Sequence, residues 1–430
     1  MPVQPRIARV IGAVNIGSFR VSAMIAGVTD EGEMIVLGSN HRASQGIKRG
    51  YVTDMAAATY AVRDAIDRAE NMAPGVHVSN VWIACSGAGL GSIITPVEID
   101  IGGRRIEEED IEHLLVAARD SIEPDGRTVL HAQPACYFLD GADGIGIANP
   151  RGLHAERLGV DIHAMLADGA PIRNLTEAAQ KAHLSVEAVV ASPLATGLAC
   201  LSEEERDLGV ALVEFGAQVT NVSVYAAGML VGLTGIQRGS GDITDAIASA
   251  FGIRRFQAER LKCVNGSAIA SPADHREMIS VAGPEDDASG PVARGADDKN
   301  RIPRAELISV ITGELDVLMG EVARSLERMG FASGRGRKIV ITGGGAELAG
   351  LADYAQAALG NPVRIGRPPQ LRGLPEAHAV PGFATLAGLV LYAAEDPVDI
   401  RRVGSRFTPT TTIAGFATVQ RLWVAMKEYF

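Results

Sequence analysis

Residues 343–345 are three consecutive glycines that follow a strand-forming run at residues 339–342. A turn without Cβ atoms lets the backbone approach a ligand closely. At the carboxyl end of a strand in an α/β sheet that ligand is often a nucleotide, held by backbone N–H groups and the start of the next helix. A tight connection without a ligand has the same sequence pattern, so this turn alone leaves both interpretations open.

Two other polar turns lie about 200 residues apart in segments that are similar to each other. One predicted hairpin covers residues 7–27 with its turn at 15–18, and the second covers residues 208–228 with its turn at 214–217. Both read as strand, polar turn with glycine, strand, glycine. Such an internal repeat indicates two related halves.

The elements around these turns predict an α/β protein. Apolar residues recur at helical spacing over 55–72, behind Asp54 as the expected N-cap, and over 305–328. Residues 81–85 predict a buried strand, and 86–162 predict a small α+β unit. A Gly-rich turn at 239–241 leads into a further helix. The stretch 282–300 is rich in Pro, Gly and Asp, which is typical of a loop.

Composition excludes several classes of protein. With 430 residues the chain is expected to form two or more domains. A formal net charge of −11 argues against nucleic acid as a partner. The four cysteines form no CxxC pair, which predicts free thiols in a reducing cytosol, and the histidines show no metal-ligand spacing. We find no signal peptide and no apolar run of spanning length.

The last residues, 414–430, predict an amphipathic helix that binds a membrane surface. They follow a polar, basic linker at 396–413, which separates them from the acidic body. A helix packed on the protein's own surface is the alternative, which the linker disfavours. The apolar stripe, which we predict to bind the membrane, consists of Phe416, Val419, Leu422, Trp423, Met426 and Phe430.

The two hairpins, the late glycine turn, the insert and the terminal helix together resemble the actin/Hsp70/sugar-kinase superfamily, and within it the FtsA family of bacterial cell-division proteins. Residues 238–252, 258–262 and 350–365 carry the closest similarity, and the resemblance covers nearly the whole chain. It implies an α/β fold of actin-like, duplicated ribonuclease-H-like domains with an inserted, small α+β subdomain of SHS2 type.

The resemblance also implies a division into segments. The first half is expected at 1–85 and 163–206, with the insert at 86–162 and a closing helix at 380–395. The second half is expected at 207–242 and 306–379, with a peripheral subdomain at 243–305. The linker at 396–413 and the membrane-targeting helix at 414–430 complete the chain.

ATP is the cofactor that the resemblance implies, and Mg²⁺ is left open. Two hairpin turns would hold the phosphates, Glu259 and Lys262 would face the ribose and base, and the glycine turn would pack on the adenosine. The expected nucleotide-binding residues are Asn15, Gly17, Ser18, Glu214, Gly216, Ala217, Gly239, Glu259, Lys262, Gly343, Gly344 and Gly345. We assign no catalytic and no metal-binding residues.

Both phosphate turns depart from the superfamily pattern, which has Asp in each to hold hydrated Mg²⁺. This chain has Asn15 and Glu214, and the second turn ends in Asn221. Because Mg²⁺ requires tight octahedral geometry and phosphoryl transfer requires close positioning, we expect impaired nucleotide binding and slow or absent hydrolysis. A pseudo-ATPase with an empty or structural cleft is the alternative. We therefore expect a nucleotide-binding protein rather than an enzyme.

By resemblance, the chain would tether the FtsZ ring to the inner face of the cytoplasmic membrane at the division site and polymerise there. Its expected partners are the FtsZ C-terminal tail, further copies of itself, anionic lipids and other division proteins. Arg301 and Arg304 are our candidates for contacting the tail's carboxylates, although they also fit ordinary solvated charge at a helix start. A sugar or metabolite kinase, and a shape-determining or pilus-linked actin-like protein, are the alternatives.

Overall fold

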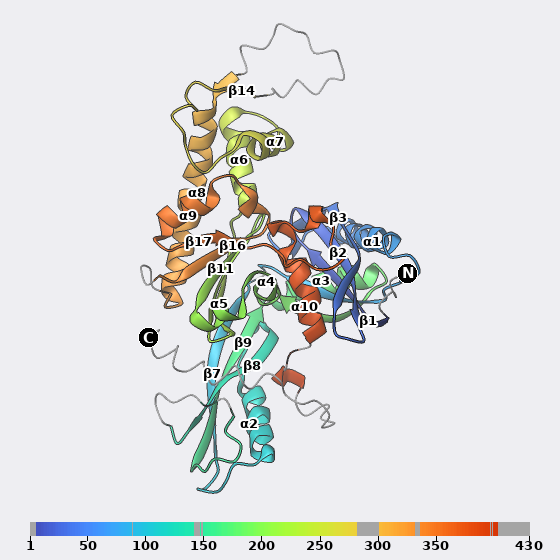
Figure 1. The fold of residues 1–430 in the computed structure, drawn as a ribbon, viewed down its shortest axis with the longest axis vertical. Coiled ribbons are helices and arrows are strands. Elements are labelled where there is room, and N and C mark those ends of the chain that lie inside the picture. Colours follow the sequence, from blue (N-terminus) through green and yellow to red (C-terminus); the bar gives the residue numbers. More distant parts are fainter. Residues whose placement is uncertain are drawn as a thin grey trace.

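The computed structural model describes residues 6–87, 89–141, 147, 149–281, 301–331, 336–395, 397 and 399–402. These residues form an elongated molecule (Figure 1). The helices α6 (Ser240–Phe251), α7 (Arg255–Asn265) and α8 (Arg304–Arg328) reach toward one end. The insert, with α2 (Glu108–Ser121), lies at the other end, and the first half lies to one side.

The first half contains a five-stranded sheet in the order β3-β2-β1-β6-β10. Strands β1, β2 and β3 are antiparallel neighbours, whereas β6 and β10 extend the sheet in parallel. The strands are β1 Ile7–Ile16, β2 Arg20–Thr29, β3 Met34–Ala43, β6 Asn80–Cys85 and β10 Ser185–Ala191, beside the short pair β4 Ile47–Lys48 and β5 Tyr51–Val52. The helices are α1 Met55–Asn71, α3 Gly169–Lys181, α4 Ser192–Cys200, α5 Glu203–Leu208 and the late α10 Ala384–Glu395.

The second half repeats this topology in the order β13-β12-β11-β16-β17. Again three antiparallel strands come first and two parallel strands follow. The strands are β11 Val210–Phe215, β12 Thr220–Ala226, β13 Met229–Ile236, β16 Lys338–Thr342 and β17 Val363–Ile365, with the outlying pair β14 Met278–Ser280 and β15 Arg301–Pro303. Helix α9 is Leu351–Leu359. The duplication predicted from the two hairpins is therefore confirmed.

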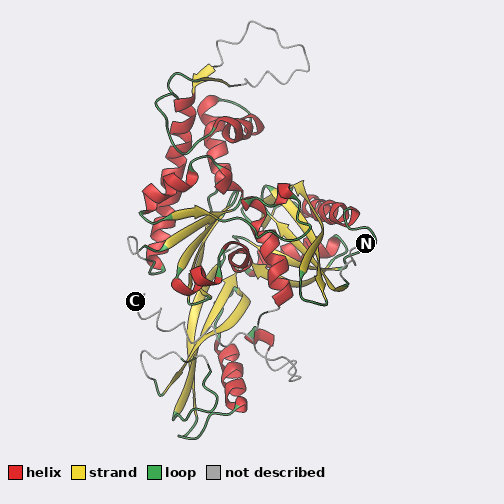
Figure 2. Ribbon diagram, viewed as in Figure 1, coloured by secondary structure: helices red, strands yellow, loops and turns green. Residues whose placement is uncertain are grey.

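The insert continues the second sheet as three antiparallel strands in the order β7-β9-β8, with α2 packed on them (Figure 2). They are β7 Gly91–Asp100, β8 Thr128–Leu139 and β9 Arg157–Ala167. A single register pair, Thr234 with Gly91, joins β13 to β7. The expected boundary at residue 162 falls inside β9, because apolar strand residues continue to Ala167.

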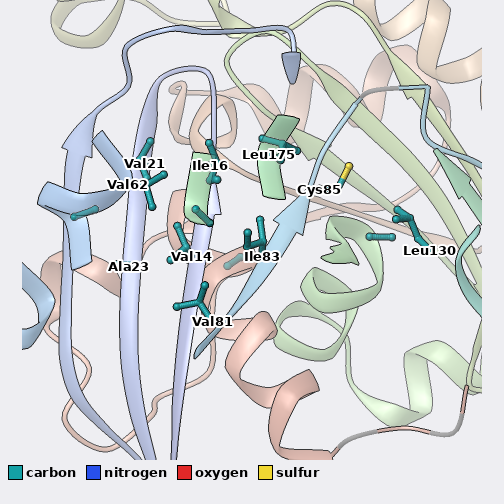
Figure 3. Packing of buried hydrophobic residues seen from close by; sticks show 14 of the residues in the cluster. Val14, Ile16, Val21, Ala23, Val62, Val81, Ile83, Cys85, Leu130 and Leu175 are labelled. Atoms are coloured by element: carbon teal, nitrogen blue, oxygen red, sulfur yellow. The ribbon is translucent and has the colours of Figure 1, made fainter. Parts of the chain in front are cut away.

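Aliphatic side chains fill the space between the sheet and the helices. In the first half, Val14, Ile16 and Ile83 of the sheet pack with Val62 of α1 and Leu175 of α3 (Figure 3). The Asp54 carboxylate caps α1 by accepting a hydrogen bond from the Ala57 amide at 3.0 Å, as expected from the sequence.

Helices α4 and α10 cross where the two halves meet. A Cβ atom at Gly388 of α10 would collide with the Ala195 carbonyl of α4, so this approach requires glycine. The closing helix was expected from residue 380, but a short 3₁₀ turn at Pro381–Phe383 precedes α10, which begins at Ala384. A second 3₁₀ turn, Gly344–Glu347, lies between the glycine turn and α9.

Candidate functional site

The second hairpin turn is built around Glu214, the last but one residue of β11. Each carboxylate oxygen has two donors: Oε1 accepts from the Thr196 and Thr385 hydroxyls, and Oε2 accepts from Ser192 Oγ at 2.8 Å and Asn221 Nδ2 at 3.0 Å. These donors come from α4, α10 and β12, the elements at the junction of the two halves. The side chain therefore joins three elements.

Burial governs the electrostatics of this carboxylate. Glu214 is only 6% exposed. Burial raises the pKa of Glu214, while the hydrogen bonds from Thr196, Asn221, Ser192 and Thr385 partly offset the rise by stabilising the charged form. With both oxygens already satisfied, the carboxylate has no open position for the water shell of Mg²⁺. The metal role that the superfamily assigns to this position does not fit this chain.

The rest of the second turn is occupied by the start of α6. The Ser240 and Gly241 amides donate to the Gly216 and Ala217 carbonyls at 2.9 and 2.6 Å. A Cβ atom at Gly239 would lie 2.6 Å from the Ala217 carbonyl carbon, so this position admits only glycine at the observed approach. These helix-start amides hold the turn and are not directed at a ligand.

The glycine turn packs against the second hairpin. Gly343 has φ +88°, and a Cβ atom there would lie 2.6 Å from the Phe215 carbonyl oxygen. At Gly345 a Cβ atom would lie 2.6 Å from the Phe215 ring. A Cβ atom at Gly344 meets nothing within 4 Å. Two of the glycines are therefore required by packing, and only Gly344 faces open space.

Glu259 and Lys262, which were expected to face the ribose and base, form an ion pair with each other. Lys262 Nζ donates to the Ser240 carbonyl at 3.0 Å, to Thr244 Oγ1 at 2.8 Å and to Glu259 Oε2 at 2.9 Å. All three ammonium hydrogens are thus used inside the protein. Burial acts to raise the pKa of Glu259, but the charge of Lys262 and the hydrogen bonds from Thr244 and Lys262 bring it below its usual value.

The first hairpin turn has a different character. Asn15, Gly17 and Ser18 are all partly exposed, in contrast to the buried Glu214. The Gly17 amide donates to the Arg20 carbonyl at 3.1 Å, which closes the turn. Ser18 Oγ accepts from the Gly50 amide at 3.4 Å.

Arg49, which was not predicted as a site residue, connects the first half to the region of the second turn. Its amide donates to Gln218 Oε1 at 2.8 Å, and its guanidinium pairs with Asp242 Oδ1 at 2.9 Å and contacts the Gln237 carbonyl. Arg49 has φ +50°, and glycines at 46 and 50 flank it. The position of Arg49 between Gly46 and Gly50 was the only signal in the sequence for this contact between the halves.

Arg20 lies between the first turn and the glycine turn, and the sequence analysis missed it too. Its guanidinium stacks 4.1 Å from the centroid of the Phe383 ring. Burial lowers the pKa of Arg20, and the nearby charge of Glu347 acts in the opposite direction. His378 stacks on the same ring with a centroid distance of 4.0 Å. This places a fixed cation beside the first turn.

The structure thus gathers the hairpin turns, the glycine turn and the Glu259–Lys262 pair around one junction. The arginines predicted to bind the FtsZ tail lie elsewhere, in the peripheral subdomain. Arg304 pairs with the buried Asp274 at 2.5 Å and donates to the Asn265 carbonyl at 2.8 Å, so it fastens a loop. Arg301 is exposed on β15.

The predicted membrane stripe, from Phe416 to Phe430, lies outside the described residues. Among the described helices, none has the length and apolar character needed to cross a membrane. The linker predicted at 396–413 is described only at its start, where Ile400 is buried against the insert. That start is therefore docked rather than detached. In the described part of the chain, no group of three His, Cys, Asp or Glu side chains suits a metal ion.

Comparison with known proteins is consistent with this geometry. The family model for cell division protein FtsA matches residues 211–388, and the model for the SHS2 domain inserted in FtsA matches residues 87–166. Cell division protein FtsA of Rhizobium meliloti is 34% identical over 442 residues, covering 100% of this chain and 97% of the relative. The Escherichia coli K12 protein is 29% identical, covering 90% and 91%.

Solved structures share the fold at low identity. The PilM–PilN type IV pilus biogenesis complex matches with a TM-score of 0.60 at 18% identity, covering 91% of this chain and 99% of that one. MreB5 of Spiroplasma citri bound to ADP matches with a TM-score of 0.50 at 13% identity, covering 90% and 97%. These likenesses show an actin-like fold, and the full-length sequence match goes further: the chain belongs to the FtsA family of cell-division proteins.

Proposed function

We propose that this chain tethers the FtsZ ring to the inner face of the cytoplasmic membrane at the division site and polymerises there. The observation that supports this proposal most strongly is the full-length match to the FtsA family, which includes the SHS2-type insert. FtsZ, further copies of the chain, anionic lipids and other division proteins are its proposed partners. Its location would be peripheral, on the cytoplasmic side.

ATP is the proposed ligand of the junction between the halves. Asn15, Gly17 and Ser18 would receive the phosphates, and the open backbone at Gly344 would lie against the adenosine. Arg20 supplies positive charge next to the first turn. Because Glu214 is already saturated by internal donors, we propose weak or absent hydrolysis, and so a nucleotide-dependent assembly protein rather than an enzyme.

The nucleotide proposal is tested by blocking the open position. Gly344→Trp should fold, because a side chain there begins in free space, but it should fill the adenosine position. We expect ATP to raise the melting temperature of the parent and not of the variant. Gly313→Trp is the matched control, since Gly313 of α8 is also unobstructed. Equal ATP protection of Gly344→Trp and the parent would show that the nucleotide binds elsewhere.

The membrane proposal rests on the terminal sequence. Half-burying six large apolar side chains contributes on the order of 6 kcal/mol, which the ordering of the segment largely offsets. One tail should therefore bind weakly, and polymerisation would supply avidity. Trp423→Glu should release the protein from phosphatidylglycerol vesicles in a sedimentation assay. Gln420→Glu adds the same charge outside the stripe and should remain bound. Equal binding of both variants would remove the anchor role.

The FtsZ contact is proposed on the peripheral subdomain. Arg301 keeps an exposed side chain, while Arg304 holds Asp274 in place, so only Arg301 can be reversed without loosening a loop. Arg301→Glu should weaken binding of an FtsZ tail peptide about tenfold, and Arg276→Glu, another exposed cation of the subdomain, should not. Unchanged affinity of Arg301→Glu would place the tail on another surface.

A further inference from the structure

The chain returns to the insert after α10. Residues 400–402 form a short 3₁₀ turn, η4, which lies against β8 and α2. Ile400 is 0% exposed and belongs to the core of the insert, together with Leu114 of α2 and Leu158 of β9. Ile400, which lies more than 230 positions after the last strand of the insert, therefore completes the core of the insert.

His131 of β8 is the second attachment. Its Nε2 accepts a hydrogen bond from the Ala191 amide at 3.0 Å, so that nitrogen carries no proton and Nδ1 is the protonated one. Nδ1 then faces Tyr392 Oη of α10 at 3.2 Å and Asp399 Oδ2 at 3.7 Å. One buried imidazole thus contacts the first half, the closing helix and the segment before η4.

Asp399 and Arg401 complete the attachment. Arg401 Nε and Nη2 lie 2.9 and 2.6 Å from Asp399 Oδ2, and Arg401 Nη1 donates to the Val129 carbonyl of β8 at 2.9 Å. Burial alone would raise the pKa of Asp399, but the interactions with His131 and Arg401 lower it well below its usual value. The carboxylate is therefore charged and paired, which favours one fixed geometry.

We propose that residues 399–402 are a strap that locks the orientation of the insert against α10 and couples the C-terminal segment to it. Residues 400–402 contact β8 and α2, so a force applied to the chain at residue 402 acts directly on these two elements of the insert. Releasing the strap frees the insert to move relative to the two halves. The contacts of residues 399–402 with the insert do not require a lipid, so this part of the proposal is independent of membrane binding.

Hydrogen exchange on the full-length protein in solution tests the lock. Asp399→Asn keeps the size of the side chain but removes its charge, and Arg401→Ala removes the bond to Val129 from a partly exposed position. Both should raise amide exchange in β8 and α2 at least tenfold, while exchange in β11 and α8 stays at parental rates. Glu395→Gln changes a neighbouring carboxylate on α10, whose charge interacts with Arg206, and should match the parent.

Two outcomes would overturn the proposal: unchanged exchange in the insert of both variants, or an increase spread evenly over the whole molecule. Should Asp399→Asn fail to fold, Arg401→Ala alone decides.

A second arm adds phosphatidylglycerol vesicles. The parent should show slower exchange in β8 on binding, and Arg401→Ala should bind the vesicles without that change. If the parent does not bind vesicles, the membrane proposal fails while the solution result still decides the strap. If it binds and β8 does not respond, the coupling is refuted.

Discussion

The two hairpin turns occupy equivalent positions in sheets of the same topology, yet their polar side chains have opposite surroundings. Asn15 of the first turn is partly exposed, whereas the carboxyl group of Glu214 in the second turn is buried and surrounded by four donors. The repeat thus preserves backbone geometry without preserving chemistry. One turn remains accessible to a ligand, and the other has become part of the junction between the halves.

This difference follows from where the neighbouring helices lie. Helices α4 and α10 cross beside the second turn, so a longer carboxylate there reaches hydroxyls of both. Beside the first turn, the guanidinium of Arg20 instead stacks on the Phe383 ring. Substitutions at equivalent positions should therefore have very different consequences.

The largest effect is expected at Glu214. Glu214→Leu removes the acceptor that Ser192, Thr196, Thr385 and Asn221 share, and should reduce the free energy of unfolding by about 4 kcal/mol. Asn15→Ala, at the equivalent place in the first turn, should change it by less than about 1 kcal/mol. Urea denaturation of both variants measures the difference. Comparable losses would mean that the two turns share one structural role.

A second, smaller contrast lies within the glycine turn. Gly345→Ala forces a methyl group against the Phe215 ring of the second hairpin and should cost about 2 kcal/mol. Gly344→Ala meets no atom and should cost well under 1 kcal/mol in the same denaturation experiment. If Gly344→Ala were the more damaging variant, the assignment of open and packed glycines would be reversed.

Sequence reasoning predicted the duplicated halves, the insert and the turns, because these depend on local pattern and on order along the chain. It did not predict which side chains would be internal. Nothing near Glu214 in the sequence reveals that Thr385 will donate to it across the junction. Arg49, Arg20 and the docking of Ile400 depend likewise on contacts between distant segments. The residues at 282–300 and 403–430 lie outside the described structure, so their predictions stay untested.

The smallest contrast concerns pH. Near the first turn, burial together with the charges of His41 and Arg20 lowers the pKa of His378 to about 4, below the ordinary value of about 6.5. Between those two pH values the unfolded chain binds the proton more readily, so stability falls as pH decreases through this window. Burial raises the pKa of Glu214 in the second turn, so its effect on stability has the opposite pH dependence. The folded state takes up the proton more readily than the unfolded chain, and stability rises as pH decreases toward the usual pKa range of a glutamate.

His378→Gln keeps an acceptor for Ser39, whose Oγ lies 2.8 Å from His378 Nδ1, but does not titrate. The parent should therefore lose about 1 kcal/mol more than this variant between pH 7 and pH 5, as measured by urea denaturation at each pH. His163 of the insert, whose pKa burial also lowers to about 4, contributes equally to both proteins and cancels in the difference. Parallel pH profiles for parent and variant would show that the first turn carries no such acid sensitivity, and that its contrast with the second turn is one of packing alone.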